Sequence, residues 1–127
     1  MGYRSDVAAV FYPNTSLTAA EGAEAYSLFK TLMNTTYKAV LDEFGAAFEW
    51  VDDRHVLQFR CDDVKWYPSY PDVQRFTRFF EDVSDGEVPN MECEFIRIGE
   101  DSDDVERTSS EHSDYKLSVS RSINIDL

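Results

Sequence analysis

The hydrophobic and polar positions along the chain predict several strands. Residues 6–12 are apolar at nearly every position, which is typical of a central strand that is covered on both faces. Two short β-rich runs, 48–51 and 56–61, surround four polar residues, and this arrangement predicts a hairpin. Residues 91–98 are a further strand candidate. Residues 117–125 alternate between apolar and polar side chains, which predicts a strand with one buried face.

Two stretches have the three- and four-residue spacing of apolar side chains that is typical of amphipathic helices. The first is predicted as one long helix from Thr18 to Phe44, and Thr18 and Glu21 have the spacing of a capping box at its start. The second begins near Pro71, because proline is tolerated in the first turn of a helix, and its apolar stripe continues to Val83.

The order of these elements is strand, helix, strand, strand, helix, strand, followed by one further strand. It predicts an α+β fold of the ferredoxin-like (β-α-β-β-α-β) type, a two-layer sandwich with two helices on one face of a mostly antiparallel sheet. We expect the other face of the sheet to be partly open. The extra C-terminal strand is expected to pair with residues 91–98 through an acidic, mobile loop at 99–114. Residues 1–127 are expected to form a single domain.

Charge changes this picture more than any other property of the composition. The chain has 25 acidic and 12 basic residues, a formal net charge of −13. A field of this sign repels nucleic acid and anionic membranes and attracts basic protein surfaces, so we expect a protein partner and no direct binding to nucleic acid or membrane. The alternative is that the acidic residues serve only solubility. No apolar run approaches the ~20 residues of a membrane span and no signal-peptide pattern opens the chain, so we expect a soluble, intracellular protein.

The acidic segment that follows residues 91–98 is the main candidate for partner binding. Its members, with two acids further along, are Glu100, Asp101, Asp103, Asp104, Glu106, Glu111 and Asp114. Asp101 and Asp103 have the spacing that begins a calcium-binding EF-hand loop, but the glycine and glutamate that complete such a loop are missing. We therefore expect solvated acids that meet a protein, and no bound metal.

A second candidate is the aromatic cluster Trp66, Tyr67 and Tyr70. Tryptophan and tyrosine are frequent in the energetically dominant parts of protein interfaces, so the cluster predicts a recognition patch as one interpretation. Packing in the core and at the start of the second helix is the interpretation we favour, because tryptophan is usually mostly buried.

Signs of catalytic chemistry are weak. Cys61 and Cys93 lie in predicted strands, where a reduced cysteine serves as a small apolar residue. His55 and His112 have no cysteine or histidine at ligand spacing, and no nucleophile elbow or phosphate-binding loop is present. We expect no cofactor and no enzymatic activity, with a cryptic enzyme or small-ligand domain as the least favoured alternative.

Three short motifs of the chain together resemble motifs of a known group of proteins. They are MGYRSDV at 1–7, YPDV at 70–73, and RIGED at 97–101 followed by Asp103 and Asp104. In this combination the chain resembles small acidic proteins encoded by tailed bacteriophages and prophages. The resemblance implies a phage protein that acts in the cytoplasm of a host bacterium, and it implies no catalytic or binding residues.

The charge and this resemblance lead to two hypotheses from different classes. The first is an accessory protein that binds and inhibits a host nucleic-acid-handling or defence protein, of the anti-CRISPR or anti-restriction type, through an acidic, DNA-like surface. The second is a structural or assembly protein that self-associates, for example as a homodimer, through the open sheet face or an edge strand.

Overall fold

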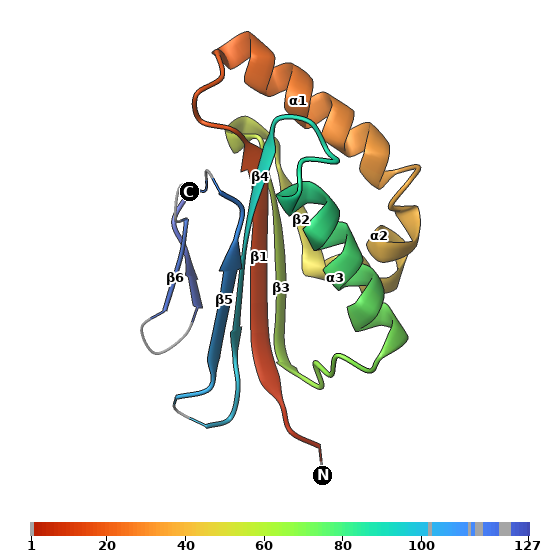
Figure 1. Ribbon diagram of the computed structural model, residues 1–127, viewed down its shortest axis with the longest axis vertical. Helices are drawn as coiled ribbons and strands as arrows, with labels where there is room; N and C mark the ends of the chain where they lie inside the picture. Colours follow the sequence, from red (N-terminus) through yellow and green to blue (C-terminus); the bar gives the residue numbers. More distant parts are fainter. Residues whose placement is uncertain (1, 102, 112, 114–115, 120–122) are drawn as a thin grey trace.

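A five-stranded antiparallel sheet lies at the centre of the computed structural model, which describes residues 2–101, 103–111, 113, 116–119 and 123–127 (Figure 1). The strands lie in the order β2-β3-β1-β4-β5, and every neighbouring pair in that order is antiparallel. Their bounds are β1 (Ser5–Pro13), β2 (Phe48–Val51), β3 (Val56–Val64), β4 (Met91–Ile98) and β5 (Val105–Ser109). The prediction of an α+β chain with a mostly antiparallel sheet is confirmed.

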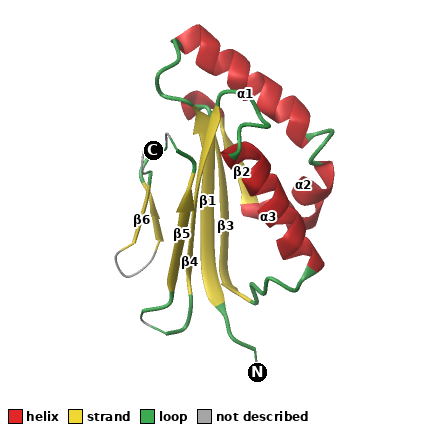
Figure 2. Cartoon of the chain, viewed as in Figure 1, coloured by secondary structure: helices red, strands yellow, loops and turns green. Residues whose placement is uncertain are grey.

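Three α-helices lie on one side of this sheet (Figure 2). They are α1 (Ala19–Met33), α2 (Lys38–Phe44) and α3 (Pro71–Ser84), and short 3₁₀ turns precede β2 at Gly45–Ala47 and β3 at Asp52–Arg54. The predicted capping box is present: the Glu21 amide donates to Thr18 Oγ1 at 3.2 Å, and the Thr18 amide donates to Glu21 Oε1 at 2.9 Å.

The prediction of a single helix from Thr18 to Phe44 is wrong, because a turn separates α1 from α2. Asn34 Nδ2 donates to the Lys30 carbonyl and Thr35 Oγ1 donates to the Thr31 carbonyl, each at 2.8 Å. Asparagine and threonine side chains compete with backbone donors for carbonyl groups in this way, which weakens the helix where several of them stand together. The apolar spacing continued across the break and concealed it.

The uniformly apolar β1 contributes to a core on each face of the sheet. Val7, Ala9 and Phe11 face the helices and are fully buried. Ala8 and Val10, which alternate with them, are also fully buried and belong to a second cluster on the other face. The prediction of a central strand covered on both faces is therefore confirmed.

Aromatic rings fill the core between the sheet and the helices. The centroids of Phe59 and Phe76 are 4.5 Å apart, and those of Phe11 and Phe79 are 4.8 Å apart. Such separations are typical of favourable ring pairs. α3 contributes most to this core, because its buried residues recur at helical spacing along one side.

The predicted C-terminal strand at 117–125 is wrong. The structure has two short strands there, β6 (Leu117–Val119) and β7 (Ile123–Ile125), which pair with each other in a separate sheet. Leu117 and Ile123 are both 2% exposed and pack on the face of the five-stranded sheet opposite the helices. Arg60 Nη1 also donates to the Ile123 carbonyl at 2.8 Å. The β6–β7 hairpin thus covers part of the face that was expected to be partly open, and it is an addition to the two predicted layers.

The expected loop at 99–114 is wrong for residues 105–109, which form β5 and take the place beside β4 that was predicted for the C-terminal strand. The turn between β4 and β5 is short enough for direct pairing, since the Gly99 amide donates to the Asp104 carbonyl at 2.8 Å. All five residues of β5 are exposed. A strand without a buried face has no hydrophobic alternation, so no periodic pattern in these residues predicts it.

Candidate partner-binding surface

Acidic side chains gather where four strand ends meet at one end of the sheet. Cross-strand pairing places Ser5 opposite Val64, Asp6 opposite Ile98, and Ile98 opposite Val105. The segments that follow β3 and β4 therefore lie at the same end. We call this region the acidic end; its acids are Asp6, Asp62, Asp63, Glu100, Asp101, Asp103, Asp104 and Glu106.

Arg97 on β4 holds the β4–β5 turn of the acidic end against the sheet through hydrogen bonds to two acids. Its guanidinium donates to Asp104 through Nη2 at 2.8 Å and Nη1 at 3.2 Å, and to Glu106 through Nε at 3.0 Å. Nη1 also donates to Ser5 Oγ at 3.1 Å. The Arg97 side chain is 17% exposed, so these charge-assisted bonds are shielded from water more than those of a typical surface pair.

Asp104 is the shared acceptor of this network. Besides Arg97, the Tyr3 hydroxyl donates to Asp104 Oδ2 at 2.6 Å. The hydrogen bonds from Arg97, followed by that from Tyr3, lower the pKa of the Asp104 carboxyl. Asp104 is thus held as a carboxylate, and its negative charge is already paired with Arg97 within the protein.

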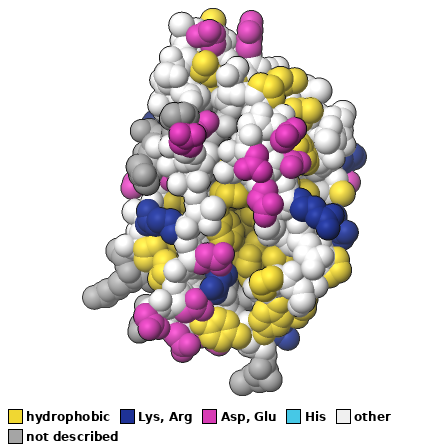
Figure 3. Space-filling view, viewed as in Figure 1, with side chains coloured by type: hydrophobic (Ala, Val, Ile, Leu, Met, Phe, Trp, Pro, Cys, Tyr) yellow, Lys and Arg dark blue, Asp and Glu magenta, His cyan; other side chains and the backbone are white. Residues whose placement is uncertain are grey.

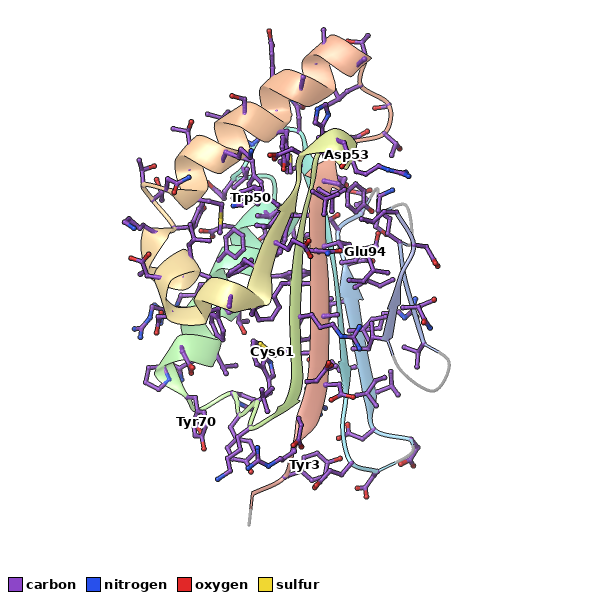
Figure 4. The ribbon with its side chains drawn as sticks, turned by 180° about the vertical axis from the view of Figure 1, so that it is seen from behind. Tyr3, Trp50, Asp53, Cys61, Tyr70 and Glu94 are labelled. Atoms are coloured by element: carbon purple, nitrogen blue, oxygen red, sulfur yellow. The ribbon has the colours of Figure 1, made fainter. Side chains whose placement is uncertain are left out.

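Gly99 and Tyr3 set the shape of the turn. The Asp104 amide donates to the Asp101 carbonyl at 3.0 Å, and the Asp101 amide donates to Tyr3 Oη at 3.1 Å. A Cβ atom on Gly99 would collide with both the Tyr3 hydroxyl and the Asp104 carboxylate. The absence of a side chain at Gly99 therefore lets the N-terminal tyrosine approach the acids of the turn. In Figure 4, Tyr3 lies at the opposite end of the sheet from Asp53.

The predicted acidic residues do not all lie together. Glu100, Asp101 and Asp103 are exposed at the acidic end, whereas Asp104 and Glu106 are paired with Arg97 there. Glu111 is exposed beyond the far end of β5. Asp114 lies outside the described residues, as does His112.

The aromatic candidates also separate. Trp66 packs among core rings, with its centroid 5.4 Å from that of Phe76 and 6.2 Å from that of Phe95. Tyr67 and Tyr70 form an edge-to-face pair at 5.0 Å, and Tyr70 is 36% exposed. Trp66 thus belongs to the packing and the two tyrosines to the surface.

A groove of about 770 Å³ lies between α3 and the β4–β5 edge of the sheet, and sequence reasoning missed it. Its floor is aromatic, and its walls are polar side chains of α3 on one side and of β4 and β5 on the other. In Figure 3, hydrophobic side chains show near the centre of this face with acidic and basic ones around them. The residues that we use to define the groove are Trp66, Phe76, Phe80 and Phe95 in the floor, Thr77, Arg78 and Glu81 on α3, and Arg97, Glu106 and Thr108 on the sheet.

The groove exists because the sheet extends beyond the helices. Phe95 on β4 lies opposite Thr108 on β5, and Arg97 lies opposite Glu106. α3 packs on β4, but within the described residues no helix covers β5. Two patterns in the sequence point to the floor and wall of this groove: the alternation of Phe95 and Arg97 along β4, and the i, i+4 pair Phe76 and Phe80 on α3. They do not predict a groove by themselves, because its second wall is formed by β5.

On the opposite face, Glu94 connects the sheet to the terminal hairpin (Figure 4). It is 4% exposed and accepts hydrogen bonds from the Lys116 and Leu117 amides, each at 3.0 Å, and from the Tyr12 hydroxyl. Lys116 Nζ lies 4.9 Å from the centroid of the Tyr12 ring. A buried carboxylate with such partners is satisfied, so we assign Glu94 the role of holding the start of β6.

The cysteine thiols are placed for packing. Burial raises the pKa of Cys61 to about 11 and raises that of Cys93 further. Both thiols are thus kept in the unreactive protonated form near neutral pH. Among the described residues, no group of three or more histidine, cysteine or acidic side chains is arranged to hold a metal ion.

Comparison of the chain with family models, curated proteins and solved structures finds no match. In the part of the chain that the structure describes, no helix has the length and apolar character needed to cross a membrane.

Proposed function

We propose that this chain is an accessory protein of a tailed phage that binds a basic surface of a host nucleic-acid-handling or defence protein and inhibits it. This is the mode of action of the anti-CRISPR and anti-restriction classes. The observation that carries the proposal is the acidic end, where exposed carboxylates stand on a turn that is fastened by the Tyr3–Asp104–Arg97 network.

Electrostatics supports this choice. The net charge of −13 favours encounter with basic surfaces and disfavours direct contact with nucleic acid. Because both carboxylate oxygens of Asp104 accept hydrogen bonds from Arg97 or Tyr3, the carboxylates of the turn that are left for a partner are those of Glu100, Asp101 and Asp103. Charges held in place before binding cost less conformational entropy when a partner arrives.

We further propose that the fold is of the ferredoxin-like type with additions. The order β2-β3-β1-β4, with one helical segment between β1 and β2 and another between β3 and β4, supports this assignment. β5 and the β6–β7 hairpin are then extensions of that unit. The proposal places the protein in the host cytoplasm, with no cofactor, no membrane contact and no enzymatic activity of its own.

The proposal is tested by expressing the tagged chain in a bacterial host and identifying what co-purifies. The wild-type chain is expected to retain a host protein with a basic surface, and the double variant Asp101→Lys, Asp103→Lys is expected to lose it. The double variant Glu24→Lys, Asp53→Lys makes the same change in net charge with exposed residues elsewhere and is expected to retain the partner. A wild-type chain that retains no host protein, or equal loss in both variants, contradicts the proposal.

Self-association is the second candidate, favoured by one observation. β5 is the last strand in the sheet order, and Val105 on it is 44% exposed. An assembly protein could use such an edge to pair with another copy. Sedimentation over a range of concentrations distinguishes the two functions, since a stable oligomer without any host partner supports assembly.

A further inference from the structure

We propose that the outer edge of β5 and the groove beside it form one binding site for an extended segment of the partner protein. In this site the segment adds to the sheet as a strand, places a large aromatic or aliphatic side chain in the groove, and places a lysine or arginine next to Glu106. The inference rests on the proposed function in one respect, because it takes the partner to be a protein.

The backbone of β5 is arranged to accept a strand. The Gly99 amide donates to the Asp104 carbonyl and the Ser110 amide to the Cys93 carbonyl, at 2.8 and 2.9 Å. In an antiparallel pair such inward-facing residues alternate with outward-facing ones, so the backbone groups of Arg107 and Ser109 and the carbonyl of Val105 point away from β4. The Val105 amide donates to the Asp103 carbonyl at 3.1 Å. Within the described residues, no strand pairs with that edge. Addition of a peptide strand to an exposed sheet edge is a common mode of recognition.

The groove lies on the side of β5 where the side chains of an added strand would point. Thr108 and Glu106 face the groove, and their backbones point toward β4. A residue of the added strand opposite Thr108 therefore has its side chain on the groove side, where only the small threonine separates it from Phe95. Phe80 and Phe95 lie 5.9 Å apart at the floor and are 6% and 8% exposed, which leaves ring surface at a depth that a long side chain can reach.

Charge determines which flanking residues suit the site. Arg97 is poorly placed to bind an incoming anion, because Nε and both Nη atoms already donate to Asp104, Glu106 or Ser5. Glu106 is 55% exposed and lies at the sheet wall, while Glu81 and Arg78 lie on the α3 wall. A basic side chain is thus directed to the Glu106 side, away from Arg78, and the −13 charge of the chain disfavours acidic segments throughout.

A capped hexapeptide, acetyl-Thr-Lys-Thr-Trp-Thr-Lys-amide, is the probe for this site. Its lysines and tryptophan lie on one face of a strand, and we expect it to add antiparallel to β5. Titrated into the ¹⁵N-labelled full chain at low salt, it is expected to shift the amide signals of β5 and of Thr77 to Glu81. Replacing its tryptophan by alanine, or both lysines by glutamate, is expected to weaken binding at least about tenfold.

Backbone N-methylation of the peptide distinguishes binding by strand addition from binding through side chains alone. In antiparallel addition with the tryptophan opposite Thr108, the threonines that flank the tryptophan face the outward groups of β5, so N-methylation of these threonines is expected to abolish binding. N-methylation of the tryptophan removes an amide that points away from β5 and is expected to leave binding unchanged. Equal loss for both peptides overturns the proposal.

Variants of the protein locate the site. Thr108→Trp fills the groove and is expected to abolish peptide binding, whereas Val105→Trp places the same ring on the other face of β5 and is expected to preserve it. Absence of signal shifts, shifts confined to residues 100–103, or a β5-paired dimer that the peptide does not disrupt overturns the proposal. If the tagged chain still captures a host protein while the peptide does not bind, this inference fails and the proposed function stands.

Discussion

Gly99 lies so close to Tyr3, 96 positions earlier in the chain, that a methyl group on the glycine would collide with the tyrosine hydroxyl. The Tyr3 hydroxyl donates to Asp104 and accepts from the Asp101 amide, so the N-terminal segment completes the turn that presents the acids. The conformation of the acidic end therefore depends on tertiary contacts between distant parts of the chain.

Gly99→Ala is expected to destabilise the protein by about 1–3 kcal/mol, because the Tyr3 and Asp104 side chains must move apart to make room. Thermal or denaturant unfolding measures the change. Gly22→Ala is the control: a Cβ there makes an ordinary 3.8 Å contact with Pro13, and alanine favours the helix by about 0.5–1 kcal/mol. A similar decrease in stability for both variants would contradict the assignment of a steric collision to Gly99 alone.

The stability of the protein is expected to depend on pH through Asp104. Its pKa is lowered in the folded state by hydrogen bonds from Arg97 and Tyr3, so the carboxylate stabilises the fold above its ordinary pKa of 3.8. This contribution is lost as the pH falls below 3.8 and through the lowered pKa. Unfolding of wild type and Asp104→Asn between pH 2 and pH 7 should give curves that differ near neutral pH and converge in acid. A constant difference across the range would assign the effect of the substitution to packing alone.

Glu94→Ala is expected to free the β6–β7 hairpin from the sheet. It leaves the buried Leu117 amide without its acceptor, at a cost of about 1–3 kcal/mol. Hydrogen exchange at the Lys116 and Leu117 amides should become faster, with core strands unaffected. Glu94→Gln retains one acceptor oxygen and should give a smaller increase; unchanged exchange in both variants would contradict the assigned role.

Phe76 is expected to be the most sensitive of the α3 positions. It is 1% exposed and contacts rings from β3, β4 and the segment before α3, so Phe76→Ala should cost about 3–5 kcal/mol in denaturant unfolding. Leu28 on α1 is 44% exposed, and Leu28→Ala should change stability by no more than about 0.5 kcal/mol. Similar losses for the two would mean that the helix-side core is packed differently.

The elements with a buried face were predictable from the sequence. β1 was apolar on successive residues because it contributes to two cores, and α3 had a regular stripe because one side of it packs on the sheet. The capping box at Thr18 and Glu21 is a local interaction and was equally visible.

The rest depended on tertiary contacts that no local pattern records. β5 exists because it pairs with β4, although none of its side chains is buried. Leu117 and Ile123 point to the same core from two antiparallel strands, and a single extended strand would give the same alternation. The acidic segment was recognised as a surface, but its pairing with Arg97 and Tyr3, and the groove behind it, required the positions of β5 and α3.

The composition of β5 has a consequence for the choice between a partner and a second copy of the chain. If two copies paired antiparallel along all five residues of Val105–Ser109, the central position would place Arg107 directly opposite Arg107 of the other copy. Like charges opposite each other on neighbouring strands are destabilising. We therefore expect this symmetric pairing of two copies through β5 to be disfavoured, whereas a different segment need not present an arginine at that position.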